Sequence, residues 1–240
     1  MKKAVLLIGI TALIASSSSY AGDVFYHSSY ISGYPDGTFG PDNGLTRAEV
    51  AKIMVTSNEL ELALGSGFYD VEDGHWASPY ISTAKLRGYI NGNDDGSYRP
   101  DSNITRAEFA SIVYRSIEWY VPEDLKKDKN LAFSDIKNHW GKVHINVLGK
   151  LGVIRGAGDG KFSPDDLITR AEAVTIINRV QGRLPDNEKI DKMVKPLYRD
   201  KDISKHWGYH DIMEASVDHE FYVIGDSEKN QREFWTKFYF

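Results

Sequence analysis

Three arginines are the residues in this sequence most able to do chemistry, because each recurs in the same tetrapeptide, Thr-Arg-Ala-Glu: Arg47, Arg106 and Arg170. The Thr and the Glu form a capping box that starts a helix. A cation in the first turn faces the positive end of the helix dipole, which disfavours it by about 1 kcal/mol or less. One interpretation is an exposed Arg paired with a loop aspartate, such as Asp42, Asp101 or Asp165. The other is an anion site, since free helix amides and a guanidinium together suit a carboxylate or phosphate.

The tetrapeptides end three copies of a 17-residue stretch, at 33–49, 92–108 and 156–172. Repetition of this length is typical of an array of supersecondary units. In each copy an Asp-Gly pair supplies a turn, and an aromatic residue two positions later anchors the loop. Helices are therefore expected to begin after Thr46, Thr105 and Thr169.

A second recurring signal is the dipeptide His-Trp, found at 75–76, 139–140 and 206–207. Apolar residues follow each Trp at the fifth and eighth positions, which lie on one face of an α-helix. An aspartate precedes each segment and is expected to be a cap or turn residue: Asp70, Asp135 and Asp202. Every strong periodicity is helical, so the sequence predicts an all-α fold.

The domain organisation begins with residues 1–21, which have the features of a secretory signal peptide: two lysines, an apolar run and a small-x-small cleavage site. That run is too short to span a bilayer. The remaining chain begins with a first unit that lacks its first helix, at 22–66, and continues with two full units, at 67–120 and 133–183. Linkers follow these full units at 121–132 and 184–201, and a partial fourth unit with an aromatic tail ends the chain at 202–240.

Composition narrows the choice of partner. The 240-residue chain has a formal net charge of −5, which becomes −7 when two lysines leave with the signal peptide. Such a protein lacks the basic footprint that nucleic acid requires, so an anionic partner must be bound by local sites. The absence of cysteine excludes disulfides and Cys-type zinc sites. We expect an exported protein that does not span the membrane.

Taken together, these motifs resemble the S-layer homology family, whose pattern joins an Asp-x-x-x-His-Trp segment, a Gly-Tyr-x-Asp-Gly-x-Phe-x-Pro-Asp loop and a Thr-Arg-Ala-Glu helix. The match covers residues 33–183 and, in part, 202–216. The resemblance implies three helix-loop-helix modules in a pseudo-threefold helical spindle. It also implies that grooves between neighbouring lobes bind cell-wall polysaccharide, notably sugars that carry ketal-linked pyruvate, and that the protein is secreted to the cell wall or cell surface.

The resemblance further implies which residues form the grooves. The three motif arginines, Arg47, Arg106 and Arg170, would be carboxylate ligands. The loop glycines and the tryptophans would shape the grooves: Gly33, Gly92, Gly156, Trp76, Trp140 and Trp207. For each Trp the alternative is packing in the core.

Patterns for an enzyme or a metal site are weak. The run from Asn91 to Asp95 resembles the start of a calcium loop, but Ser102 stands where a bidentate Glu is required. His206 and His210 lack the His-Glu-x-x-His context of a zinc site. We expect a non-enzymatic wall-binding module without metal or cofactor. The alternatives are an envelope scaffold that binds another protein and, less favoured, a wall-active glycosidase that uses a carboxylate pair.

The two incomplete units lead to a further expectation. A capped helix without a His-Trp partner, and a His-Trp helix without a capped partner, would each be marginal in water. We therefore expect the helix at 206–216 to pack beside the Arg47 helix and to close the array as a ring. The rival arrangement is an open array whose end helices form a dimer.

Overall fold

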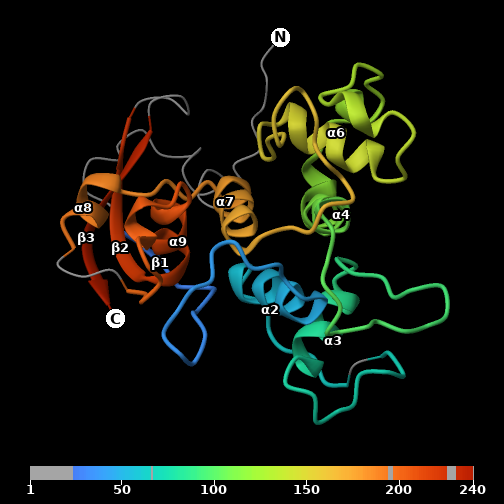
Figure 1. The fold of residues 1–240 in the computed structure, drawn as a ribbon, viewed down its shortest axis with the longest axis horizontal. Coiled ribbons are helices and arrows are strands. Elements are labelled where there is room, and N and C mark those ends of the chain that lie inside the picture. Colours follow the sequence, from blue (N-terminus) through green and yellow to red (C-terminus); the bar gives the residue numbers. More distant parts are fainter. Residues whose placement is uncertain (1–23, 66, 194–196, 226–230, 240) are drawn as a thin grey trace. The chain divides into compact units, whose positions relative to one another are not determined.

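A computed structural model describes residues 24–239 except 66, 194–196 and 226–230, so the predicted signal peptide lies outside the described residues. The described chain forms two compact units, one of Gly44–Thr169 and the other of the residues up to Asn43 and from Arg170 onward. Figure 1 shows the elements, with these bounds: β1 Phe25–His27, α2 Arg47–Ser57, α3 Ser78–Leu86, α4 Arg106–Ile117, η1 Glu118–Tyr120, α5 Glu123–Lys126, η2 Ser134–Ile136, α6 Lys142–Lys150, α7 Arg170–Gln181, α8 Asn187–Asp191, η3 Ile203–Lys205, α9 Tyr209–Ser216, β2 Asp218–Ile224 and β3 Arg232–Tyr239.

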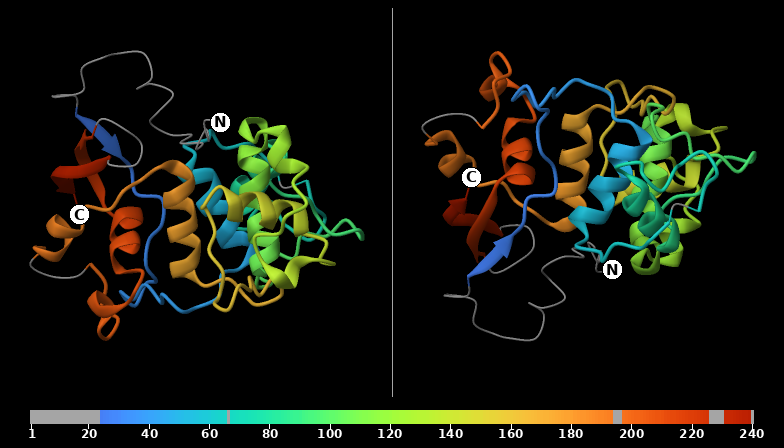
Figure 2. Two further views of the ribbon diagram at one scale, coloured as in Figure 1. Left: turned by 90° about the horizontal axis from the view of Figure 1, so that it is seen from above. Right: turned by 90° about the horizontal axis from the view of Figure 1, so that it is seen from below.

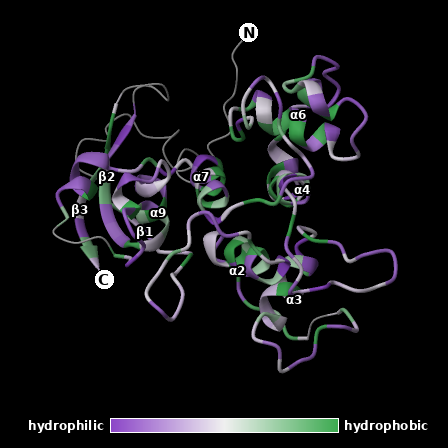
Figure 3. Cartoon of the chain, in the orientation of Figure 1, coloured by the Kyte–Doolittle hydropathy of each residue, from purple (hydrophilic) through white to green (hydrophobic). Residues whose placement is uncertain are grey.

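The helices of the first unit pack in pairs that join successive repeats. Helix α2 packs against α3, and α4 packs against α6. The apolar positions predicted for α3 and α6 are fully buried: Ile81, Ala84, Ile145 and Leu148. In Figure 3 the hydrophobic and hydrophilic bands along α6 show this amphipathic character. Each capped helix therefore packs against the His-Trp helix of the following repeat.

A closed triangle of backbone hydrogen bonds joins three segments of the first unit. The Leu45 amide donates to the Ile168 carbonyl (3.3 Å), the Ile168 amide to Ile104 (3.2 Å), and the Ile104 amide to Leu45 (3.0 Å). Each of these residues directly precedes the Thr of a Thr-Arg-Ala-Glu motif, and all three side chains are fully buried. The three repeats thus meet at the points where their capped helices begin.

The same pairing rule holds in the second unit, where α9 packs against α7. The predicted partner of α9 was the Arg47 helix, and within its own unit α9 packs against α7 instead. Residues before α9 nevertheless complete the first repeat. The Phe39 and Gly40 amides in its loop donate to Asp200, at 2.6 and 2.8 Å. The first loop and the segment leading to α9 therefore belong to one structural module.

The all-α prediction is wrong, because the second unit contains a three-stranded antiparallel sheet in the order β1-β2-β3. Both views in Figure 2 show the blue strand β1 alongside the red strands. The register of β1 on β2 pairs His27 with His219. Burial alternates along β2, where His219 and Phe221 face inward, and along β3, where Glu233 and Trp235 do. This period of two specifies strands with one buried face. The aromatic tail thus forms an edge strand.

The segments predicted as linkers contain short helices. Helix α5 lies in the first, where Asp128 forms an ion pair with Lys150 of α6. Helix α8 lies in the second and packs near α9. None of the helices in the described part of the chain has the length and apolarity that a bilayer crossing requires.

Candidate functional site

The first backbone amides of each capped helix donate hydrogen bonds to carbonyl groups of a neighbouring loop. At α2 the Arg47 and Ala48 amides donate to Ser102 and Pro100, both at 2.9 Å, and the equivalent amides of α4 and α7 have equivalent partners. The third amide of α2 and of α4 is bonded by the capping Thr side chain, as predicted. Because these amides are occupied, the part of the anion-site hypothesis that rested on free helix amides is wrong.

The motif arginines bind the same loops through their side chains. The Nε of Arg47, Arg106 and Arg170 donates to the carbonyl of a loop aromatic residue, at 2.6, 2.9 and 2.8 Å. Each guanidinium also lies over the ring of that aromatic, 4.6–4.7 Å from its centre. The partners of the three arginines are, in order, Tyr98, Phe162 and Phe39. This latch from helix to loop explains why an Arg recurs where the helix dipole disfavours it.

The loop aspartates proposed as Arg partners pair with histidines instead. The Nε2 atoms of His206 and His139 lie 3.2 and 3.3 Å from Asp42 and Asp165, and that of His75 lies 3.9 Å from Asp101. In each His-Trp pair the His Nδ1 accepts a backbone amide two residues later, at 3.0–3.1 Å. Nδ1 is therefore the acceptor, and Nε2 carries the proton that faces the aspartate.

A second set of aspartates clamps the loop aromatics. The backbone amides of Tyr98 and Arg99 donate to Asp70, at 2.8 and 2.7 Å. Asp135 and Asp200 bind the third and first loops in the same way. These amide hydrogen bonds outweigh burial and lower the pKa of Asp135. Asp202, predicted as a cap or turn residue, begins η3 in a left-handed conformation, and the neighbouring Asp200 clamps the first loop.

The three loop glycines are required by a close backbone approach. A Cβ at Gly33, Gly92 or Gly156 would overlap the carbonyl oxygen of the residue five positions later, and an aromatic ring from the clamping segment lies against each position as well. In each loop the amide after the glycine donates to that same carbonyl, at 2.7–2.8 Å. Only glycine fits so tight a turn.

The tryptophans are exposed, so the alternative of core packing is wrong. Trp76, Trp140 and Trp207 are each more than half exposed, and each stacks or tilts against the histidine that precedes it. Their large apolar faces are available to a partner. An exposed aromatic with a polar edge is typical of a binding surface.

The first unit brings three of the predicted site residues, Arg47, Gly92 and Trp140, to one open cleft. Its volume is about 180 Å³. Helix α4 supplies one wall through residues at i, i+3, i+4 and i+7, a spacing that places them on one face of a helix: Glu108, Ser111, Ile112 and Arg115. Sequence reasoning missed this wall, although its helical spacing was visible. Trp76 and Gly156 do not line this cleft.

The cleft carries two cations and one carboxylate. Arg47 Nη1 lies 3.3 Å from Glu108 Oε1, and the other oxygen of Glu108 accepts the Thr105 amide at 2.8 Å. Arg115 donates to the Tyr89 carbonyl at 3.4 Å. Burial lowers the pKa of Arg115, which nevertheless stays charged at neutral pH. An anion entering the cleft would thus meet an excess of positive charge.

The repeated loops, latches and caps define the class of protein: the chain belongs to the S-layer homology domain family. The model of the S-layer homology domain matches residues 26–51, 67–110 and 132–174. The three matches contain the three loop-and-capped-helix stretches, up to the start of each capped helix.

Relatives in two genera share most of this chain. It is 35% identical over 213 residues to cell surface glycoprotein 1 of Acetivibrio thermocellus, and 33% identical over 208 residues to a cellulosome-anchoring protein of that organism. These alignments cover 85% of this chain but 9% and 45% of the relatives. An S-layer protein of Bacillus licheniformis is 31% identical over 166 residues, 68% of this chain and 18% of the relative. The chain thus spans less than half the length of each of these relatives.

Proposed function

We propose that this chain is a non-enzymatic anchoring module that binds an anionic cell-wall polysaccharide at the cell surface, with the Arg47 cleft as a principal site. The observation that carries the proposal is the meeting of Arg47, Arg115 and Trp140 around one cleft. Two relatives are named as a cellulosome-anchoring protein and an S-layer protein, which supports an anchoring role.

The chemistry of the cleft favours a sugar that carries a carboxylate. A guanidinium fork binds a carboxylate through charge-assisted hydrogen bonds, and an indole face packs against the apolar face of a sugar ring. The volume is below the roughly 300–1,000 Å³ of pockets that enclose a whole drug-sized ligand. The cleft therefore suits one residue of a polymer. A pyruvate ketal on that residue would place its carboxylate at Arg47, and Arg106 and Arg170 would act chiefly as latches.

The test is a pull-down with purified wall sacculi, before and after extraction of the anionic polymer. Arg47→Ala should weaken binding by about 2 kcal/mol, or roughly 30-fold, because a charged partner loses its hydrogen bonds. Arg47→Lys should restore part of the loss, since Lys keeps the charge but not the fork. Arg87→Ala is the matched control, because Arg87 is exposed in the same unit at the end of α3, outside the cleft.

Three outcomes would contradict the proposal. Wall binding that survives extraction of the polymer but not protease treatment of the sacculi would favour the protein scaffold. Equal binding by Arg47→Ala and Arg87→Ala would show that the Arg47 cleft does not bind the polymer. Release of reducing sugar from the sacculi would favour a hydrolase.

A further inference from the structure

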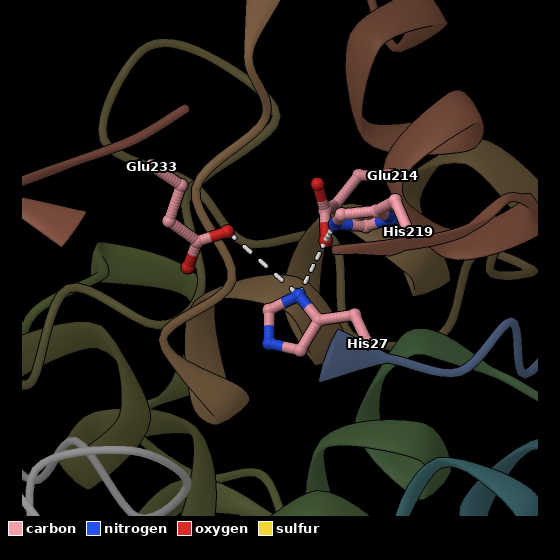
Figure 4. Close-up of side chains that lie close together, drawn as sticks. All are labelled: His27, Glu214, His219 and Glu233. Carbon is pink, nitrogen blue, oxygen red and sulfur yellow. Dashed lines mark hydrogen bonds and ion pairs between the residues drawn. The ribbon is translucent and has the colours of Figure 1, made fainter. Parts of the chain in front are cut away.

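The second unit contains a buried cluster of two histidines and two glutamates that wall binding does not use. Figure 4 shows its members, which come from four elements: His27 on β1, Glu214 on α9, His219 on β2 and Glu233 on β3. All four residues are buried, and one ligand atom from each lies within 4.8 Å of the others. Burying this many ionisable groups is costly unless they are paired or bind a metal ion.

The spacing of the ligand atoms suits one metal ion. His27 Nδ1 lies 2.9 Å from Glu214 Oε1 and 3.7 Å from Glu233 Oε2. His219 Nε2 lies 3.3 Å from Glu214 Oε1. In a tetrahedral zinc site with bonds of about 2.0–2.2 Å, neighbouring ligand atoms are about 3.3–3.6 Å apart. Small side-chain shifts would bring the four atoms to that arrangement.

The hydrogen bonding of His219 directs a lone pair into the cluster. Its Nδ1 lies 2.8 Å from the Val217 carbonyl, and because a carbonyl only accepts, Nδ1 carries the proton of the neutral ring. Nε2 is then an acceptor. It is buried, has no hydrogen-bond partner, and faces a carboxylate oxygen of Glu214. Two acceptors this close repel unless a proton or a metal ion lies between them.

Glu233 presents a second unpartnered acceptor. Its Oε2 is buried without a hydrogen-bond partner and faces His27. The nearest fixed cation is Arg183, whose Nη1 lies 3.9 Å from Glu214 Oε1, beyond hydrogen-bonding distance. Arg183 therefore offsets charge without occupying a ligand atom. The cluster retains lone pairs on two residues that no group of the described chain satisfies.

Surrounding contacts orient the candidate ligands. Trp235 Nε1 donates to the outer oxygen of Glu214 at 3.2 Å, which leaves the inner oxygen directed at the histidines. The Trp235 ring also stacks on His219, with centres 3.9 Å apart. Together with the His219 hydrogen bond to Val217, these contacts resemble the outer shell that fixes the tautomer and direction of metal ligands.

We propose that His27, Glu214, His219 and Glu233 bind one divalent transition-metal ion, with Zn²⁺ favoured, in a closed structural site. Imidazole and carboxylate ligands together suit Zn²⁺ and its neighbours in the first transition row better than Ca²⁺ or Mg²⁺. Four buried protein ligands leave no position open for substrate, which is typical of structural zinc. The ion would tie β1 to α9 and to the β2–β3 pair, joining residues 187 positions apart.

Metal binding is tested on the full chain. After chelator treatment, titration with Zn²⁺ should load about one ion per chain, and Zn²⁺ should raise the thermal midpoint, because binding to the folded state stabilises it. Co²⁺ should give the intense visible absorption of a four-coordinate site, and excess Ca²⁺ or Mg²⁺ should not displace it. Wild-type protein that loads no Zn²⁺ and melts at an unchanged temperature would overturn the proposal.

Substitution of the ligands locates the ion. His219→Ala and Glu233→Gln should each weaken Zn²⁺ binding by more than the roughly 10- to 100-fold that loss of an outer-shell contact produces. The matched controls are His210→Ala and Glu188→Gln, since these residues lie at partly or largely exposed positions outside the cluster. Glu233→Gln keeps the shape of the side chain and should fold. Folded Glu233→Gln with wild-type affinity would contradict the site, and if either variant misfolds the wild-type Co²⁺ spectrum decides.

Discussion

Arg47 and Arg170 occupy the same position of the same motif, yet their surroundings differ. The Arg170 guanidinium lies 4.6 Å from the centres of both the Tyr34 and Phe39 rings, and the residue is buried. Arg47 lies over one ring, lines the cleft, and is only partly buried. The residue after the loop glycine differs between the two sites: it is Tyr34, whose ring contacts Arg170, in one loop and Asn93, which lines the cleft with Arg47, in the other. The motif specifies the latch, and residues outside the motif set the exposure of each arginine, since Arg106 is buried although the residue after its loop glycine is Ala157.

The largest expected effect separates the two arginines by stability. Arg170→Met should lower the free energy of unfolding by about 3 kcal/mol, because two loop carbonyls lose a buried charged donor and two rings lose their cation. Arg47→Met should lower it by about 1 kcal/mol, since water can reach its partners. Chemical denaturation of the two variants, each followed by hydrogen exchange in its own unit, measures the difference. Equal losses would mean that the surroundings of the two arginines do not matter.

A smaller effect is expected from exchanging the residue after the loop glycine. Asn93→Tyr should cover Arg47 as Tyr34 covers Arg170, and should weaken wall binding at least tenfold, or about 1.4 kcal/mol. Part of the stability would be lost too, because the Asn93 side chain donates to Ser97. The reciprocal Tyr34→Asn is the control and should leave binding at the Arg47 cleft unchanged. Wild-type binding by Asn93→Tyr would show that exposure of Arg47 is not what the ligand uses.

The smallest effect concerns the loop clamp of the third repeat, which presents Phe162 to Arg106. The folded-state pKa of Asp135 is lowered, so its stabilising contribution is present above the unfolded pKa near 3.8 and is lost as pH falls through the folded value. Asp135→Asn should cost about 1 kcal/mol or less at pH 7, because the carboxylate is partly exposed, and nothing once Asp135 is protonated. Unfolding curves of the wild type and Asp135→Asn, recorded at pH 7 and at a pH below the folded-state pKa of Asp135, measure this loss of stability. A loss that persists at low pH would assign the effect to packing.

Much of the repeat was predictable because its determinants are local. A turn, an anchor and a capping box occupy 17 consecutive residues, so the loops, the helix starts and the buried apolar positions follow from spacing. Asp202 was predicted as a cap or turn residue and begins η3, but counting back from Trp207 does not show which aspartate reaches the distant first loop. Asp200 does so, aided by Tyr198, whose ring packs on Phe39.

The sheet and the buried cluster of two histidines and two glutamates were not predictable in the same way. Helical periodicity dominated the chain, and the alternation along β2 extends over only seven residues. The cluster draws one residue from β1 and the others from the last part of the chain, so no spacing of histidines and glutamates signals it. Only the pairing of β1 with β2 brings His27 beside His219.

The triangle of hydrogen bonds among Leu45, Ile104 and Ile168 has a kinetic consequence. Each residue donates to one neighbour and accepts from the other, so the ring contains no local bond, and its widest contact joins residues 45 and 168. A contact between distant residues requires the chain to close a long loop, and this costs entropy before the contact contributes any stabilisation, which slows folding. During synthesis the triangle cannot form until Ile168 has left the ribosome. Until then the segments before the first two capped helices lack the hydrogen bonds to Ile168 that complete it.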